Sequence, residues 1–266
     1  MGVLNVTPDS FSDGGRFLDH DRALAHGLEM ARQGADVVDV GGESSRPGAE
    51  PVPEAEELRR VVPVVAALAP HVRVSIDTVK PAVAEAAVEA GATLVNDISA
   101  SLWAVAAATG AGWVAMHMQG APRTMQDHPR YRDVVAEVHG FLVARGRQAR
   151  DAGVREVFLD PGIGFGKSVE HNLTLLRHLG ELVAEGFPVL VGTSRKSFLG
   201  RLRRAPGSPP APAEERLPGT LATSAWAMLS GASMVRVHDV AGAVQAATLV
   251  GPVRIGGALA GAVPGR

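Results

Sequence analysis

The chain has no cysteine, few lysines and few aromatic residues. Among its 266 residues, aromatic side chains make up 4%, and lysine occurs only at Lys80, Lys167 and Lys196. The absence of cysteine excludes a disulfide framework, a thiolate metal site and a cysteine nucleophile. Because arginine is far more frequent, we expect the three lysines to stand where a compact ammonium cannot be replaced by a planar guanidinium.

Excess positive charge and long apolar runs are also missing. The formal net charge of −2 at pH 7 gives no basic footprint for nucleic acid or for an anionic membrane. No apolar run approaches the roughly 20 residues that span a bilayer, and the start lacks a charged region followed by an apolar signal segment. We therefore expect no nucleic-acid partner, no membrane contact and a cytoplasmic location.

Short apolar segments alternate with amphipathic helical segments along the chain. Hydrophobic residues make up 46% of it, and glycines are expected to end six successive helices. Strict alternation predicts parallel strands joined by right-handed crossovers, and eight units close a barrel. We predict an α/β protein, a single (β/α)8 TIM barrel domain over residues 1–266, with an open doubly wound sheet as the alternative. The predicted strands are 1–6, 36–40, 72–76, 93–96, 112–116, 156–160, 188–191 and 233–237. The predicted helices are 20–33, 54–69, 80–90, 101–108, 131–151, 169–185, 217–231 and 239–250. The six glycines are Gly34, Gly91, Gly110, Gly153, Gly186 and Gly231.

Three connections depart from this rhythm, and we predict long mobile loops after strands 1, 2 and 7. The first and second are rich in hydroxyls and charged groups, and residues 201–216 are rich in proline. Loops of this kind on a rigid barrel commonly carry binding residues.

Polar residues follow nearly every predicted strand. In a barrel these positions converge on one face. Each acid or amide alone is equally well explained as a helix cap, but capping does not explain the cations. The strand-end set is Asn5, 43–46, Asp77, Asn96, Asp97, His117, Asp160, 195–197, Arg236 and His238.

The residue types in this set suit a planar, amino-substituted anionic ligand. Asp77, Asn96 and Asp160 form a row of acceptors and amides for an amidine-like ring edge. Lys196 is expected to donate to a ring carbonyl and to keep the carboxylates ionised. Arg236 with His238 supplies positive charge at strand 8, where barrels commonly hold phosphate. The alternative is a solvated basic turn at residues 192–197.

The glycine-rich run 160–167 has neither Walker spacing nor the dinucleotide fingerprint. We interpret it as a wall that approaches a ligand closely. Lys167 is left unassigned, with a structural salt bridge at this loop as the favoured alternative. Four histidines show no metal-ligand spacing and are interpreted as surface or helix residues. They are His117, His139, His171 and His178.

Five motifs in this order resemble those of bacterial dihydropteroate synthases, a family of pterin-binding barrels. The first two are shared with other pterin-binding barrels, and the last two are typical of the synthase. The motifs are Asn5–Gly15, Gly41–Gly48, Asp160–Lys167, Ser194–Ser197 and Arg236–Asp239.

The resemblance implies a transferase of folate biosynthesis. It would condense 6-hydroxymethyl-7,8-dihydropterin diphosphate with p-aminobenzoate to give 7,8-dihydropteroate and diphosphate. It also implies Mg²⁺, a homodimer and a sulfonamide target. Two alternatives are a methyltetrahydrofolate-dependent methyltransferase barrel and a pterin-binding paralogue without catalysis.

The resemblance also implies roles for individual residues. Asp13, Lys196, Arg236 and His238 would act in catalysis, and Asn5 would hold the metal with the diphosphate. Ser45 departs from the family, which usually carries Thr at this position. The pterin set would be Asp77, Asn96, Met116, Asp160, Phe165 and Lys196. The diphosphate set would add Ser45, Arg46, Arg236 and His238, and the p-aminobenzoate set would be Ser45, Arg46, Pro47 and Ser197.

Overall fold

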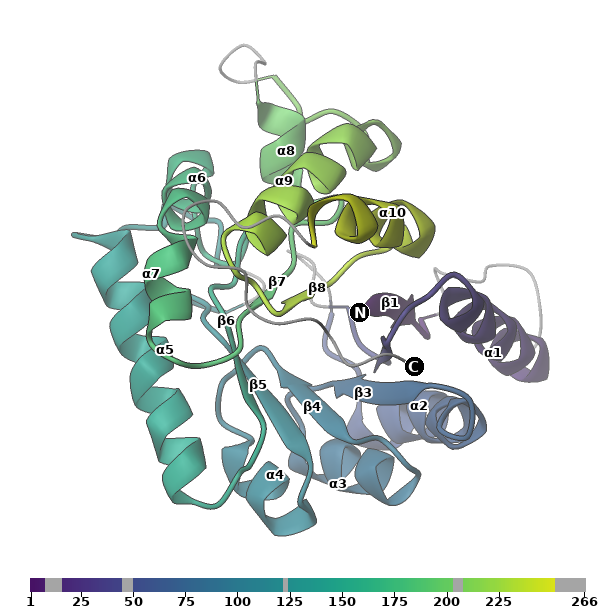
Figure 1. Cartoon of the computed structure of the whole chain (residues 1–266). Helices are drawn as coiled ribbons and strands as arrows, with labels where there is room; N and C mark the ends of the chain where they lie inside the picture. The colour runs from purple at the N-terminus through teal and green to yellow at the C-terminus, as the bar shows by residue number, and fades with distance from the viewer. Residues whose placement is uncertain (8–15, 45–49, 122–123, 203–207, 252–266) are drawn as a thin grey trace.

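The strands form a closed ring with helices around it (Figure 1). The computed structural model of the chain describes residues 1–7, 16–44, 50–121, 124–202 and 208–251. Six parallel strands pair in sequence order, and β7 pairs with β8, also in parallel. The bounds are β1 Gly2–Asn5, β2 Val37–Gly41, β3 Arg73–Asp77, β4 Leu94–Asp97, β5 Gly112–Met116, β6 Val157–Asp160, β7 Leu190–Val191 and β8 Met234–Val235.

Two seams join the six-stranded sheet to the β7–β8 pair. Leu159 N donates to Pro188 O at 2.9 Å on one side. On the other side, Val3 N donates to Val237 O and Val237 N donates to Met1 O, each at 2.9 Å. The ring therefore closes on itself, and the predicted eight-unit α/β barrel is confirmed.

The helices cover the outside of the ring, with α2, α3 and α4 on one side and α9 and α10 on the other (Figure 1). Each predicted helix-ending glycine has a positive φ, between +74° at Gly110 and +113° at Gly91. The bounds are α1 Arg16–Arg32, α2 Glu54–Leu68, α3 Pro81–Glu89, α4 Trp103–Thr109, α5 Val134–Asp151, α6 Val169–Arg177, α7 Leu179–Ala184, α8 Ser197–Arg201, the 3-10 helix η2 Ala213–Arg216, α9 Leu217–Leu229 and α10 Val240–Val250.

The prediction of one helix over residues 169–185 was wrong. The backbone leaves helical geometry at His178, with φ −98° and ψ 14°, so α6 and α7 are separate. Leu175, Leu176, Leu179 and Leu182 are all buried, so the apolar pattern continues across the break and hides it. The short helix α8 was also not predicted.

An apolar layer fills the barrel interior below its carboxyl end. Its members are buried side chains from neighbouring strands. Since side chains alternate along a strand, residues two positions further on face the same interior. The layer consists of Met1, Val37, Leu94, Val114, Phe158 and Leu190, with Met234 packed against it.

Parts of the three long connections lie outside the described residues, at 8–15, 45–49 and 203–207. Their mobility therefore stays a prediction. Within the described part of the chain, none of the helices is long and apolar enough to cross a bilayer.

Candidate active site

A layer of polar side chains lies directly above the apolar layer. Asp39 comes two residues after Val37, Asn96 after Leu94, and Asp160 after Phe158. Strand register brings neighbours together, because Asp77 pairs with both Gly41 and Asn96, and Met116 pairs with Asp160. The period-2 alternation of each strand therefore places Asp39 on one interior face with the predicted residues Asp77, Asn96, Met116 and Asp160.

Arg236 joins two acidic residues from neighbouring strands. Its Nε donates to Asp39 Oδ2 at 2.6 Å, and its Nη2 donates to Asp77 Oδ2 at 2.7 Å. Asn96 Nδ2 donates to the same oxygen of Asp39 at 2.9 Å. Asp39 is fully buried, and its Oδ1 has no hydrogen-bond partner among the described residues. The Asp39 carboxylate of β2 thus contacts Asn96 of β4 and Arg236 after β8, and Arg236 extends the network to Asp77 of β3.

Asp39 is the site residue that the sequence interpretation missed. It stands inside the buried strand Val37–Gly41, where every residue is buried. A charged residue is almost never fully buried unless it is paired, so this position was itself a signal for a cation on a neighbouring strand.

Burial and neighbouring charges shift the pKa values of Asp77 and Arg236. Desolvation raises the pKa of Asp77 to about 7, although the Arg236 guanidinium acts in the opposite direction. Burial also opposes the charge of Arg236, but Asp39 and Asp77 outweigh it and raise the pKa of the guanidinium. Arg236 therefore keeps its charge, while Asp77 exchanges a proton near neutral pH.

Lys196 and Asp160 lie on the other side of the ring. Lys196 Nζ donates to Ile163 O and lies 4.4 Å from the centroid of the Phe165 ring. Burial lowers the pKa of Lys196 to about 8. Burial also raises the pKa of Asp160, and the opposing effect of Lys196 does not cancel it. Lys196 thus favours the charged form of Asp160, the direction expected from the sequence, and it acts against the effect of burial.

The glycine-rich run packs closely against its neighbours. Gly162, Gly164 and Gly166 have φ values of +64°, +86° and +61°. A Cβ on Gly164 would lie 2.9 Å from Lys196 Cδ, and a Cβ on Gly162 would lie 1.8 Å from His117 O. Only glycine fits both the backbone and the space, so this loop sets where Lys196 lies.

Lys167 lies beneath this loop, and the interpretation of its neighbour His117 as a surface or helix residue was wrong. Lys167 Nζ contacts His117 Nδ1 at 3.0 Å, His117 O at 3.2 Å and Phe165 O at 3.0 Å, where a salt bridge was the favoured alternative. Burial lowers the pKa of Lys167 to about 7 and that of His117 to about 3. His117 is buried, not a surface residue, since the β5 and β6 connections enclose it.

Strands 7 and 8 bring a hydroxyl next to His238. Ser194 Oγ lies 2.9 Å from His238 Nδ1 and accepts a hydrogen bond from His238 N at 3.1 Å. Ser197 begins α8 and is exposed. Asn5 ends β1 opposite Gly41, so it belongs to the same rim.

Some acids that follow strands hydrogen-bond to the backbone that comes after them. Asp97 accepts hydrogen bonds from the backbone nitrogens of Ser99, Ser101 and Leu102, and Asp239 caps α10 through Gly242 N. Asp77 caps no helix, since α3 begins after Lys80 without a side-chain cap. Four predicted residues lie outside the described part of the chain: Asp13, Ser45, Arg46 and Pro47.

The polar layer of acids, amide and amines above an apolar floor fits the predicted family, and the comparisons with known proteins test it. The family model of pterin binding enzymes matches residues 1–238. The chain belongs to this family. It is 49% identical over 261 residues to the dihydropteroate synthase of Mycobacterium leprae, covering 94% of this chain and 92% of that protein.

Solved structures of pterin-binding enzymes agree. One is the Xanthomonas albilineans dihydropteroate synthase with 4-aminobenzoic acid, at 47% identity and a TM-score of 0.84, covering 94% of this chain and 90% of that one. Another is the Thermus thermophilus enzyme in complex with 6HMPPP, at 44% identity and a TM-score of 0.80, covering 95% and 93%. The predicted resemblance, transferase class and dihydropteroate synthase activity are confirmed.

Proposed function

We propose that one barrel domain of this chain condenses 6-hydroxymethyl-7,8-dihydropterin diphosphate with p-aminobenzoate. The observation that carries the proposal is the polar layer in which Asp77, Asn96, Asp160 and Lys196 face the barrel mouth above apolar residues. The ligands of the related Xanthomonas and Thermus structures support the same pair of substrates.

The pterin ring is bound by the acceptors and donors of this layer. Asp77, Asn96 and Asp160 bind the amino-substituted edge, and Lys196 donates to the ring carbonyl. Met116, buried beside Asp160, and the half-buried Phe165 provide apolar contact for the ring. Because the pKa of Asp77 is raised to about 7, donors of the pterin edge stabilise its charged form on binding.

The diphosphate is held at the rim by Asn5, Ser45, Arg46, Arg236 and His238. Two of the donors of Arg236 contact Asp39 and Asp77. A guanidinium carries five N–H donors in a planar fork, so Arg236 has further donors for the diphosphate. This arrangement connects the pterin and diphosphate ends of the first substrate.

Asn5 fits a Mg²⁺ that is shared with the substrate. The described residues contain no group of three or more His, Asp or Glu side chains that could hold a metal. Mg²⁺ commonly uses one or two protein ligands together with substrate phosphates and water, and the amide oxygen of Asn5 at the end of β1 meets that need. When bound, the ion neutralises charge on the leaving diphosphate.

The reaction needs charge stabilisation more than proton transfer. The bond between the exocyclic CH₂ and the diphosphate oxygen breaks first, and the electron pair leaves with the diphosphate. Arg46, Arg236 and His238 stabilise the leaving group, while Asp13 and Asp160 stabilise the cationic CH₂. The neutral amine of p-aminobenzoate, bound by Ser45, Arg46, Pro47 and Ser197, then attacks, and its proton goes to water without a dedicated base.

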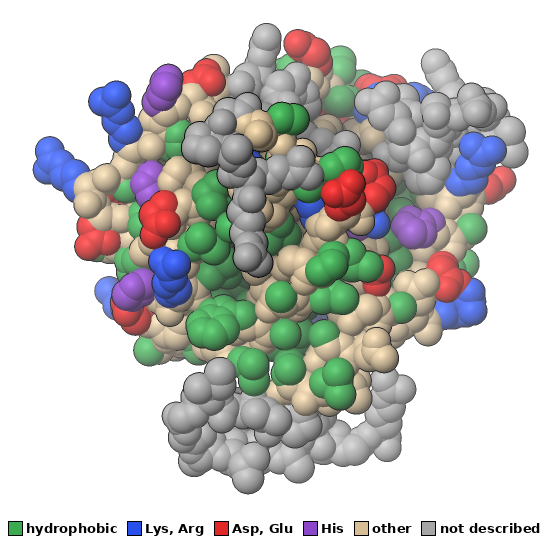
Figure 2. All heavy atoms as spheres, turned by 90° about the horizontal axis from the view of Figure 1, so that it is seen from above, with side chains coloured by type: hydrophobic (Ala, Val, Ile, Leu, Met, Phe, Trp, Pro, Cys, Tyr) green, Lys and Arg blue, Asp and Glu red, His purple; other side chains and the backbone are tan. Residues whose placement is uncertain are grey.

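A homodimer through α9 and α10 is part of the proposal. Figure 2 views the face that carries these helices and shows hydrophobic side chains gathered across its lower half. The exposed fraction reaches 45% at Trp226 and 72% at Leu249, and Val244 is also exposed. Contiguous apolar surface of this kind typically marks an interface. Sedimentation of the native chain and of Leu249→Glu tests this, with a shift of the variant toward monomer expected.

The activity is tested by measuring diphosphate release from the pterin diphosphate and Mg²⁺, with and without p-aminobenzoate. The native chain and Lys196→Ala are compared. Diphosphate release with dihydropteroate formation, lost in the variant, supports the proposal. Tight pterin binding without release points to the non-catalytic paralogue or to the methyltransferase instead.

A further inference from the structure

Four consecutive backbone carbonyls of the glycine-rich run each accept a hydrogen bond from a different side chain. One of the donors is the amine of Lys196, which is proposed to bind the pterin. The four carbonyls, of residues 163–166, are called the carbonyl row below. The pairs are Ile163 O with Lys196 Nζ, Gly164 O with Gln126 Nε2 at 2.6 Å, Phe165 O with Lys167 Nζ at 3.0 Å, and Gly166 O with Tyr131 Oη at 2.8 Å.

The β5–α5 connection packs against this row and supplies two of the donors, Gln126 and Tyr131. Its described parts are residues 117–121 and 124–133. Gln119, near one end, donates through Nε2 to Arg130 O at 2.8 Å and accepts from Arg130 N at 3.1 Å, so the connection is closed on itself. A Cβ on Gly166 would lie 2.3 Å from Gln119 O. The closed connection therefore lies directly against the carbonyl row.

Lys167 joins the carbonyl row to the end of β5. It is 3% exposed, and a lysine is almost never this buried unless it is paired. The partners of its Nζ are the backbone oxygens of His117 and Phe165 and the imidazole of His117. A methionine of similar length would fill this space without an amine to desolvate. What the amine adds is therefore the link between β5 and the carbonyl row.

We infer that Lys167 is a positioning residue for the pterin, acting together with Tyr131 through the carbonyl row on Lys196. The inference rests on the proposed function, in which Lys196 donates to the ring carbonyl of the pterin. Lys196 Nζ is held by Ile163 O and lies 4.4 Å from the centroid of the Phe165 ring. A shift of the backbone at Phe165 therefore moves both neighbours of the amine. Lys167 acts without touching the substrate.

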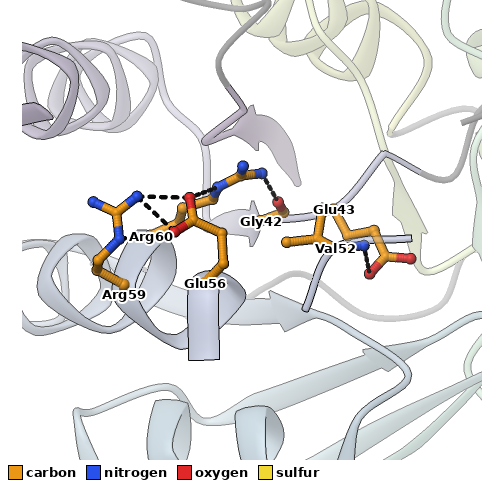
Figure 3. Close-up of polar contacts among 6 residues, drawn as sticks. All are labelled: Gly42, Glu43, Val52, Glu56, Arg59 and Arg60. Carbon is orange, nitrogen blue, oxygen red and sulfur yellow. Dashed lines mark hydrogen bonds and ion pairs between the residues drawn. The ribbon is translucent and has the colours of Figure 1, made fainter. Parts of the chain in front are cut away.

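The test compares two variants with a matched control. Lys167→Met keeps the length of the side chain and removes the donor. Tyr131→Phe removes only the hydroxyl and keeps the ring beside His171, with centroids 4.9 Å apart. Arg60→Met is the control, because Arg60 also donates to a carbonyl that follows a strand, Gly42 O at 2.9 Å, but in the β2–α2 connection (Figure 3).

Calorimetry gives Kd for 7,8-dihydropterin, a ligand without the diphosphate, so contacts of the β2–α2 connection with diphosphate do not contribute. We expect Lys167→Met to raise this Kd about tenfold and Tyr131→Phe about threefold, and Arg60→Met to leave it within about twofold. In the Lys196→Ala background, Lys167→Met is expected to change Kd by less than about twofold, because the residue through which it acts is gone.

NMR of the ligand-free protein, labelled with carbon-13 lysine, reports on the amine of Lys196 directly. The chain has only three lysines, so the Lys196 signal is the one lost in Lys196→Ala. We expect this signal to move in Lys167→Met and in Tyr131→Phe, but not in Arg60→Met. Tyr131→Phe changes no charge, so a shift in that variant reports a changed position of the amine and not a changed field.

Folded Lys167→Met and Tyr131→Phe proteins that bind 7,8-dihydropterin as tightly as the native chain would overturn the inference. An equal loss from Lys167→Met with and without Lys196 would do the same, because the effect would then bypass Lys196. An unmoved Lys196 signal in both variants would also contradict it.

Lys196→Ala separates the inference from the proposed function. If Lys196→Ala weakens binding and Lys167→Met does not, the positioning role fails and the proposed function stands. If Lys196→Ala leaves Kd unchanged, the proposed contact of Lys196 with the pterin fails, and the positioning role fails with it. If the binding changes appear as expected but the native chain forms no dihydropteroate, the condensation fails and the positioning role stands.

Discussion

The two halves of the barrel mouth hold their charges in different ways. On strands β2, β3, β4 and β8, Arg236 is paired with Asp39 and Asp77 at 2.6 and 2.7 Å. On strands β5, β6 and β7, the amines of Lys167 and Lys196 contact carbonyl oxygens, an imidazole and an aromatic ring. The first half is called the paired half below, and the second the amine half.

This difference decides which groups exchange protons near neutral pH. In the paired half, the Arg236 guanidinium keeps its charge, whereas burial raises the pKa of Asp77 to about 7. In the amine half, burial lowers the pKa values of Lys167 and Lys196 to about 7 and 8, so these charges depend on pH and on what binds. Both halves thus contain a group that exchanges a proton near neutral pH, but only the paired half holds its acids with a guanidinium that stays charged.

The largest expected effect comes from breaking the paired half. Arg236→Met leaves Asp39 and Asp77 buried without their cation, so we expect the free energy of unfolding to fall by about 3–5 kcal/mol. We expect synthase activity to be lost as well, because Arg236 is also proposed to bind the diphosphate. Urea unfolding monitored by circular dichroism measures the stability.

Arg73→Met is the control for this effect. The Arg73–Glu156 ion pair is more exposed, at 34% and 39%, so its loss is expected to cost about 1 kcal/mol or less. Equal losses for Arg236→Met and Arg73→Met would mean that burial of the paired half has no special energetic weight.

A smaller effect, dependent on pH, is expected in the amine half. An unfolded lysine has a pKa of about 10.4, whereas that of Lys167 is lowered to about 7. Between these values the unfolded chain binds a proton that the folded chain does not, so the contribution of Lys167 to stability rises with pH. We expect native stability, relative to Lys167→Met, to increase by about 2 kcal/mol from pH 7 to pH 9.

The double variant Lys80→Met with Glu57→Gln is the matched control for Lys167, because Lys80 pairs with the buried Glu57 carboxylate. The pKa of Lys80 is raised, not lowered, so its contribution to stability is constant over this range and is lost only at higher pH. Urea unfolding at pH 7, 8 and 9 measures how the stability difference between the native chain and each variant changes with pH. Parallel curves for native and Lys167→Met would show that the Lys167 amine is charged throughout.

The smallest expected effect concerns the glycine loop of the amine half. Gly164→Ala and Gly110→Ala both place a side chain on a left-handed backbone, at φ +86° and +74°, and each costs about 1–2 kcal/mol. Only at Gly164 does the new Cβ meet Lys196 Cδ, at 2.9 Å, whereas at Gly110 no atom lies within 4 Å. We expect Gly164→Ala alone to weaken pterin binding, by about tenfold by calorimetry.

A shift of the pterin Kd in both glycine variants would assign the effect to general destabilisation. Unchanged binding in Gly164→Ala would mean that the loop does not set the place of Lys196.

The sequence predicted the order of strands and helices in the barrel, because this order follows from local periodicity. Alternation of apolar segments, together with glycines such as Gly34 and Gly91, was enough for the eight-unit barrel. The convergence of Asp77, Asn96, Asp160 and Arg236 followed from their places at strand ends, since parallel strands bring these ends to one rim.

What the sequence did not predict depends on pairing between distant strands. Asp39 looked like part of an apolar strand until Arg236 of β8 was placed beside it. The contact between Lys167 and His117 was not predicted. It depends on how the connections after β5 and β6 fold over each other, which local sequence does not reveal. The break at His178 was hidden because the buried leucines keep the same spacing through it.

The most direct test of the account is discrimination between 7,8-dihydropterin and its 2-desamino analogue, with Kd for each measured by calorimetry in the native chain and in Asp160→Asn. If the buried acids bind the amino edge, the native chain prefers the pterin by about 10- to 150-fold, corresponding to about 1.5–3 kcal/mol for a hydrogen bond to a charged group. That preference is expected to fall to within about threefold in Asp160→Asn. Equal affinity of the native chain for both ligands would contradict the account.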